Sequence, residues 1–256
     1  MSYVKSEKNG NIAILSIDRP ETFNALNESV LGDLEAAVDA AAADKEVYVL
    51  IITGAGKAFV SGADIDVMSK KNHEEIIEYS KKGAGIFRKI ETLAKPVIAV
   101  MNGVAFGGGL ELTMSCDIRI AGEKAKMGLP EAGLGITPGF SGTVRLPRLI
   151  GLSKAKEWIY QGKIVNAAEA CDAGLVSAVY PQETLMDEAL KLAMNICGVS
   201  QSAVRLDKEL LNKSLELTTD EAIEREAVMQ ADAFGTPDQI EGMAAFKEKR
   251  KPVFNK

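Results

Sequence analysis

The sequence has few of the side chains on which several common kinds of active site depend. Its 256 residues include one histidine, His73, which lies in a polar segment typical of a solvent-exposed surface. A nucleophilic triad therefore has no credible base, and a metal site has no imidazole ligands. The three cysteines are far apart and form no C-x-x-C pair, so we interpret them as small buried apolar side chains in a reducing compartment.

The sequence also lacks an excess of basic charge and long apolar runs, and only 5% of its residues are aromatic. The formal net charge is −6, and the one basic cluster is confined to residues 247–251. Phosphates would be repelled by such a surface, so we expect no nucleic-acid partner. No apolar run reaches the roughly 18 residues that a membrane span needs. Residues 1–17 lack the pattern of a signal peptide, and we expect a cytoplasmic protein with no membrane contact.

The sequence does contain an alternation of strand-like and helix-like segments in its first half. Short apolar segments predict strands at Asn11–Ile17, Val47–Thr53, Val97–Met101 and Asp117–Ala121. Amphipathic segments predict helices that begin after Asn27 and span residues 73–93. From Ser153 onward almost every segment is helix-like. The pattern predicts an α/β fold followed by a largely helical C-terminal part.

A glycine-rich segment directly follows the strand predicted at Val97–Met101. It contains three consecutive glycines, Gly107 to Gly109, followed closely by Glu111. Unpaired amides at the start of a helix stabilise anions, and glycines let a ligand approach the backbone. Tight packing of the helix on the strand explains the glycines equally well at this stage.

A second segment, residues 128–143, is rich in glycine and proline and contains Glu131. Ser141 lies in this segment, but its neighbours do not have the spacing of a nucleophile elbow. Glu111 has apolar neighbours, and desolvation raises the pKa of a glutamate into the range useful for proton transfer. The hypothesis is therefore acid–base catalysis by Glu111 and Glu131. A local structural role for Glu111 and a surface position for Glu131 remain open alternatives.

Several ordered motifs resemble those of the enoyl-CoA hydratase (crotonase) family, and the likeness runs nearly from end to end. The resemblance is carried by the segments 18–20, 24–26, 61–65, 102–111, 116–119, 129–139 and 245–250. It implies a crotonase-like α/β fold, a right-handed spiral of ββα units with a C-terminal helical region used for trimer formation. We accordingly expect a core with the active site at residues 1–195 and an oligomerisation region at residues 196–256, in a homotrimer or a hexamer.

The resemblance also assigns roles to individual residues. It implies that the amides of Ala63 and Gly108 bind the thioester oxygen of an acyl-CoA and that Glu111 and Glu131 position a water molecule with help from Gly139. Coenzyme A, which is part of the substrate, is the only cofactor-like group implied, and no metal is. Contacts with it are expected from Lys57, Ala58, Ser61, Asp64, Ile65, Asp66 and Lys249.

The presence of both glutamates favours one reaction within the family. It predicts reversible addition of water to a 2-trans-enoyl-CoA, with a short chain such as crotonyl-CoA as the expected substrate. The alternatives are a Δ3,Δ2-enoyl-CoA isomerase, in which Glu131 acts alone, or another acyl-CoA enzyme of the crotonase family, and, less favoured, a non-catalytic acyl-CoA binder. Ser141 and Val144 depart from the family pattern, which has a glycine and a glutamine there, and this affects the expected shape of the loop.

Overall fold

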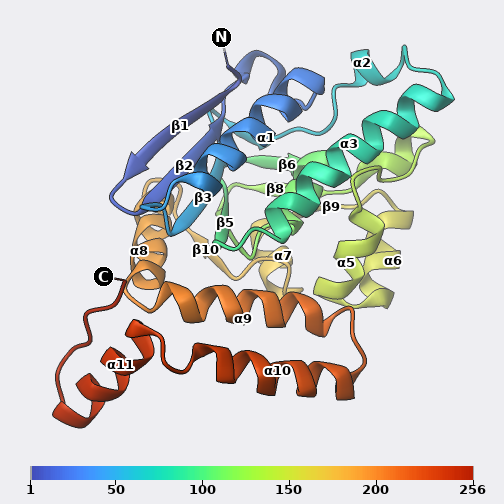
Figure 1. Ribbon diagram of the computed structural model, residues 1–256. Helices are drawn as coiled ribbons and strands as arrows, with labels where there is room; N and C mark the ends of the chain where they lie inside the picture. The colour runs from blue at the N-terminus through green and yellow to red at the C-terminus, as the bar shows by residue number, and fades with distance from the viewer. Residues whose placement is uncertain (1, 256) are drawn as a thin grey trace.

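The computed structural model describes residues 2–255, which form two sheets with helices around them (Figure 1). The six-stranded sheet has the order β1-β2-β3-β5-β7-β10, and the four-stranded sheet has the order β4-β6-β8-β9. The strands are β1 (Val4–Asn9), β2 (Ile12–Ile17), β3 (Val49–Gly54), β4 (Ala58–Val60), β5 (Val97–Met101), β6 (Val104–Phe106), β7 (Ile118–Gly122), β8 (Lys126–Gly128), β9 (Ile164–Asn166) and β10 (Ala178–Tyr180).

The helices that surround these sheets vary from one turn to five turns in length. They are α1 (Glu28–Ala43), α2 (Ile65–Met68), α3 (His73–Glu91), α4 (Gly108–Met114), α5 (Gly142–Ile150), α6 (Leu152–Tyr160), α7 (Ala167–Asp172), α8 (Leu185–Cys197), α9 (Gln201–Ser214), α10 (Thr219–Ala233) and α11 (Pro237–Glu248), with short 3₁₀ helices η1 (Pro20–Thr22) and η2 (Pro130–Leu134). None of those described is both long and apolar enough to cross a membrane.

A repeated strand–strand–helix unit distributes its two strands between the two sheets. β3, β5 and β7 pair in parallel in the larger sheet, and the strand that follows each of them, β4, β6 or β8, lies in the smaller sheet. Because β4, β6 and β8 are parallel, their carboxyl ends lie at the same edge of the smaller sheet. The loops that leave these ends are therefore brought together.

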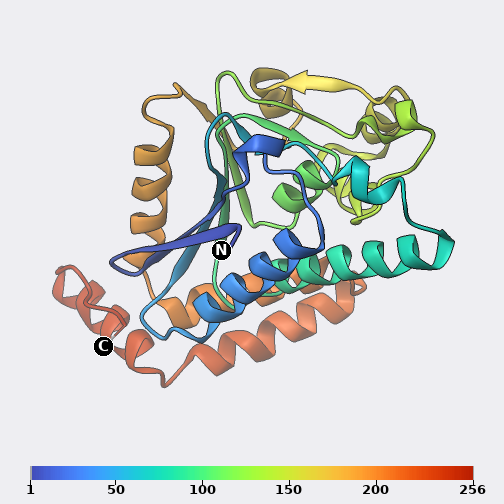
Figure 2. The same cartoon turned by 90° about the horizontal axis from the view of Figure 1, so that it is seen from above.

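The core lies mainly between the larger sheet, the smaller sheet and helices α1 and α3. Every residue of β3 and β5 is buried, as expected for parallel strands covered on both faces. The second face of the larger sheet packs against α8, which contributes Leu185, Ala189 and Ala193 to a separate apolar cluster. Figure 2 shows α8 on one side of this sheet and α1 with α3 on the other.

The predicted helix starts in the first half are confirmed by their capping contacts. The Asn27 side chain accepts a hydrogen bond from the amide of Val30 at the start of α1. Asn72 and Glu75 form a capping box at the start of α3. The predicted strands are present as β2, β3, β5 and β7; β5 has the predicted bounds, and the ends of the others differ by at most two residues.

The prediction for the second half was wrong in part. Residues after 153 include two short strands, β9 and β10, which pair with β8 and β7. Each has only three residues, too few to produce a recognisable alternation of apolar and polar side chains. The first strand, β1, was also missed, because five of its six residues are exposed and polar. The cysteine prediction holds only for Cys116, since Cys171 and Cys197 are half-buried.

Candidate active site

The loops at the carboxyl ends of β4, β6 and β8 contain most of the residues expected to act on a substrate. β4 leads to Ala63, β6 leads to Gly108 at the start of α4, and β8 leads to Glu131 in η2. In open sheets with parallel strands, ligands bind at this edge because loops from neighbouring strands converge there. The structure therefore brings together three segments of the chain, the first and last of which, at Ala63 and Glu131, are 68 residues apart in the sequence.

Glu111 is the fourth residue of α4 and is almost completely buried, with 1% of its surface exposed. Its Oε1 atom accepts hydrogen bonds from the amides of Phe140 at 2.8 Å and Gly142 at 2.6 Å. These bonds come from the turn that precedes α5. A buried carboxylate is tolerated when such donors compensate for the lost water, so the position of Glu111 depends on that turn.

Glu131 is also buried, with 7% of its surface exposed, directly before six exposed residues, 132–137. A methyl group on Gly107 would come within 2.8 Å of Glu131 Oε1, so the carboxylate packs directly on the backbone before α4. Among residues 2–255, no group donates a hydrogen bond to Glu131 Oε2. A buried carboxylate oxygen without a protein partner is suited to bind a substrate or a water molecule.

The electrostatics of the two carboxyl groups differ from those of surface glutamates. Burial, together with the charge of Glu131, raises the pKa of Glu111 to about 7, against the lowering effect of the bonds from Gly142 and Phe140 and of the Arg145 charge. Burial also raises the pKa of Glu131. Two neighbouring carboxyl groups whose pKa values are both raised above the ordinary range are suited to general acid–base catalysis.

The amides of Ala63 and Gly108 are the candidate donors to an oxyanion. Gly108 is the first residue of α4, where an amide has no partner within the helix and lies at the positive end of its dipole. Ala63 lies between two paired residues, since Leu26 N donates to Gly62 O and Asp64 N donates to Leu26 O. Within the described chain the Ala63 amide has no acceptor of its own.

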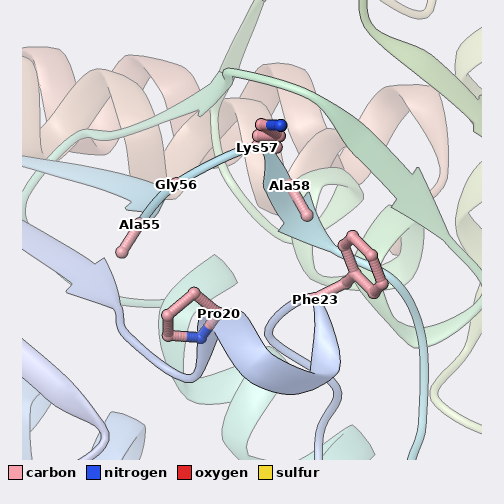
Figure 3. A pocket seen from close by; sticks show the side chains of 6 residues that line it. All are labelled: Pro20, Phe23, Ala55, Gly56, Lys57 and Ala58. Carbon is pink, nitrogen blue, oxygen red and sulfur yellow. The ribbon is translucent and has the colours of Figure 1, made fainter.

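A cavity of about 240 Å³ lies beside the segment expected to bind coenzyme A. It is lined by Pro20, Phe23 and the turn 55–58, and Figure 3 shows the two ring side chains facing that turn. Lys57, at its rim, is exposed, whereas Ala58 is buried. Phe23 was missed by sequence reasoning, although it lies between the quoted segments at residues 18–20 and 24–26. In the structure its side chain is 58% exposed at the cavity.

Other residues of the expected binding segment have contacts within the protein. Asp64 Oδ2 lies 2.7 Å from Arg19 Nη1, and the Asp64 side chain caps α2. The Ser61 hydroxyl donates to the carbonyl of Thr22. Ile65 and Asp66 begin α2 and are exposed. The side chains of Asp64 and Ser61 therefore hold the conformation of this segment. Its exposed atoms, such as those of Ile65 and Asp66, are the ones left to contact a ligand.

Two expected site residues lie apart from this arrangement or at its margin. Lys249 caps the end of α11, which is at the opposite end of the molecule from α2 in both Figure 1 and Figure 2. The structure of one chain does not bring Lys249 to the site. Gly139 is exposed and lies just before Phe140, so its amide is near the turn that holds Glu111. His73 is exposed, as predicted.

Comparisons with known proteins give a consistent result over the whole chain. The family model described as enoyl-CoA hydratase/isomerase matches residues 7–256. The chain belongs to this family. A crotonyl-CoA hydratase of Syntrophomonas wolfei is 48% identical over 97% of this chain and 96% of that protein. A short-chain-enoyl-CoA hydratase of Clostridium acetobutylicum is 44% identical over 96% of this chain and 94% of its own.

The solved structures of the enoyl-CoA hydratase/isomerase family show the same fold. The crystal structure of an enoyl-CoA hydratase from Bacillus anthracis has a TM-score of 0.96 with 36% identity and covers 99% of both chains. The chain therefore has the crotonase-like fold that its motifs indicated. The division into residues 1–195 and 196–256 falls just before the end of α8 and stays a prediction.

Proposed function

We propose that this protein is a short-chain enoyl-CoA hydratase that adds water reversibly to a 2-trans-enoyl-CoA such as crotonyl-CoA. The observation that carries the proposal is the placement of Glu111 and Glu131 beside each other at the edge where the site loops converge. The names of the related hydratases support the same reaction and the short chain length. No separate cofactor, metal or nucleic acid is part of the proposal, and its expected location is the cytoplasm.

In the proposed mechanism, the thioester oxygen accepts hydrogen bonds from the amides of Ala63 and Gly108. Negative charge develops on this oxygen as the enolate forms, and each such donor contributes roughly 3 kcal/mol to its stabilisation. One of the two glutamates takes a proton from water while the water oxygen bonds to Cβ. The other glutamate holds that water and assists the delivery of a proton to Cα. The Gly139 amide is a further contact of the water.

The nucleotide end of the substrate is proposed to bind along residues 57–66, beside the cavity formed with Pro20 and Phe23. The exposed Lys57 supplies a positive charge for phosphate groups. Lys249 is expected to contact the phosphates only if the C-terminal region of another chain approaches this edge.

The proposed assembly is a homotrimer or a dimer of trimers formed through α9 to α11. These helices expose large apolar side chains, including Leu211, Val228 and Phe246, and α10 has a single buried residue, Met229. Exposed apolar surface of this extent is typical of an interface between chains. Light scattering coupled to size-exclusion chromatography would distinguish these assemblies from a monomer.

The function is tested by following the loss of conjugated thioester absorbance when the protein meets crotonyl-CoA. The parent is expected to be fast, and Glu131→Gln and Glu111→Gln are each expected to be slower by orders of magnitude. An isomerase would retain most of its activity in Glu111→Gln and act on 3-enoyl-CoA. Failure of the parent with crotonyl-CoA and with longer 2-enoyl-CoAs would refute the hydratase proposal.

A further inference from the structure

The turn that holds Glu111 is itself held by a buried arginine to which the proposed mechanism gives no role. The donors to Glu111 Oε1 are the amides of Phe140 and Gly142, and the peptide between Phe140 and Ser141 lies between them. Ser141 has φ of 83°, a left-handed conformation that is uncommon for a residue with a side chain. The turn therefore needs contacts that hold it in place.

Arg145 makes those contacts from the first turn of α5. Its side chain is buried, and Nη1 donates to the carbonyl oxygen of Phe140 at 3.1 Å. Its own amide donates to the Ser141 carbonyl at 3.0 Å. One residue thus binds the carbonyl oxygens of the two peptides that link Phe140 to Gly142. The second of these peptides contains the Gly142 amide that faces Glu111, and the first joins Phe140 to it, so these bonds hold the segment that supplies both donors.

The Arg145 guanidinium is fixed from its other side by Glu91, at the end of α3. Arg145 Nη2 lies 2.9 Å from Glu91 Oε2, which also lies 3.0 Å from Arg88 Nη1. The backbone carbonyl of Glu91 accepts a bond from Asn212 of α9 at 2.8 Å. Burial acts to raise the pKa of Glu91, but the bonds and charges of Arg145 and Arg88 outweigh it and hold that pKa below its ordinary value. An ionised Glu91 is a firm partner for a planar guanidinium.

Arg145 also supplies the positive charge that acts on Glu111. The charged groups that face Glu111 are Glu131 from η2, which disfavours its ionised form, and Arg145 from α5, which favours it. Strands β4 and β6, which also pack on α4, contain no titratable side chain. The balance of charge at Glu111 is therefore set by one carboxylate and one guanidinium.

We propose that Arg145 is a positioning residue for the hydration reaction: it fixes the 140–142 turn that orients Glu111 and stabilises the ionised carboxylate. The proposal rests on the proposed hydratase function. Arg145 makes two contributions that can be tested separately: its positive charge and its guanidinium contacts with Phe140 and Glu91. Lysine keeps the charge but cannot reproduce the two-sided guanidinium contact. Methionine keeps the apolar stem and removes both.

The first experiment compares the kinetics of Arg145→Lys, Arg145→Met and the control Arg148→Met with those of the parent. Arg148 is exposed on the same helix and has no part in the turn. We expect Arg145→Met to lose about 100-fold in kcat with little change in KM, as misplacement of a catalytic group by about 1 Å does. Arg145→Lys should recover part of this loss, and Arg148→Met should match the parent.

The pH–rate profile gives a readout that a purely structural role would not move. Loss of the Arg145 charge removes an influence that lowers the pKa of Glu111, so the limb of the profile set by Glu111 should move to higher pH in Arg145→Met. It should stay near its original position in Arg145→Lys. An unmoved limb in Arg145→Met, or a loss that appears only in KM, would overturn the proposal.

The last experiment is independent of catalysis and so separates this proposal from the hydratase proposal. The side-chain carboxyl carbon of Glu111, labelled with ¹³C and assigned with Glu111→Gln, is titrated by NMR in the parent and in the Arg145 variants. A higher pKa in Arg145→Met than in Arg145→Lys and the parent supports the role of Arg145 whatever substrate the protein uses. Equal pKa values of Glu111 in all three proteins refute it. If Arg145→Met does not fold, the comparison of Arg145→Lys with the parent tests the contribution of the guanidinium contacts.

Discussion

Replacement of Glu111 by glutamine should remove activity and raise stability at the same time. The pKa of Glu111 is raised by burial from its ordinary 4.5 to about 7. Each pKa unit corresponds to about 1.36 kcal/mol, so the ionised carboxylate destabilises the folded state by about 3 kcal/mol above pH 7. Glutamine has no charge to bury, and its side-chain oxygen can still accept the bonds from Phe140 and Gly142.

The sign of the effect follows from the direction of the shift. A carboxyl whose folded-state pKa is raised favours the folded state at low pH, and this contribution is lost as the pH rises from 4.5 through 7. Below pH 4.5 the parent and Glu111→Gln should therefore differ least. Above pH 7 the variant should be more stable by up to about 3 kcal/mol, less the cost of an unpaired amide NH₂.

The assay is denaturant unfolding at fixed protomer concentration, followed by circular dichroism from pH 4.5 to pH 8. Glu183→Gln makes the same chemical change on an exposed loop and controls for the loss of one negative charge. A stability difference between Glu111→Gln and the parent that does not grow with pH would refute the reasoning, as would a variant less stable than the parent at pH 8.

Two further predictions concern the framework of the site. Gly109→Ala would place a methyl group 2.1 Å from the Val60 carbonyl oxygen, so we expect a loss of about 3 kcal/mol or more in unfolding free energy. Gly32→Ala, where a methyl group would meet open space on helix α1, should raise the unfolding free energy by up to about 1 kcal/mol. Similar unfolding midpoints for the two variants would contradict the packing argument. Lys208→Met would remove the ion-pair partner of the half-buried Asp117, which lies 2.7 Å from Lys208 Nζ, and should cost about 3 kcal/mol in unfolding free energy. Lys213→Met, at an exposed pair on the same helix, should cost under about 1 kcal/mol. Equal costs would show that burial of the pair is unimportant.

The sequence predicted those parts of the fold whose signals are local and long. β3 and α3 are extended runs with clear apolar patterns and recognisable ends, and both were found. The three-residue strands β9 and β10 depend on pairing with β8 and β7, which are distant in the sequence. No local pattern records such a pairing, so these strands could not be predicted.

The candidate site also has parts that the sequence could predict and parts that it could not. Glu111 and Glu131 could be proposed because carboxylates among apolar or rigid neighbours are unusual in themselves. The contact of Arg145 with the Phe140 carbonyl could not, because it depends on the left-handed conformation of Ser141 and on the ion pair with Glu91, which is 54 residues away.

The split of each ββα unit between two sheets has a consequence for how this protein can evolve. The first strands form a buried framework with one face on α8, whereas the second strands lead to loops such as residues 132–137, every one of which is exposed. Substitutions in these loops alter what a substrate meets without disturbing the framework that keeps the chain folded. Lineages of this architecture are therefore free to diversify in acyl-group preference while the framework changes slowly.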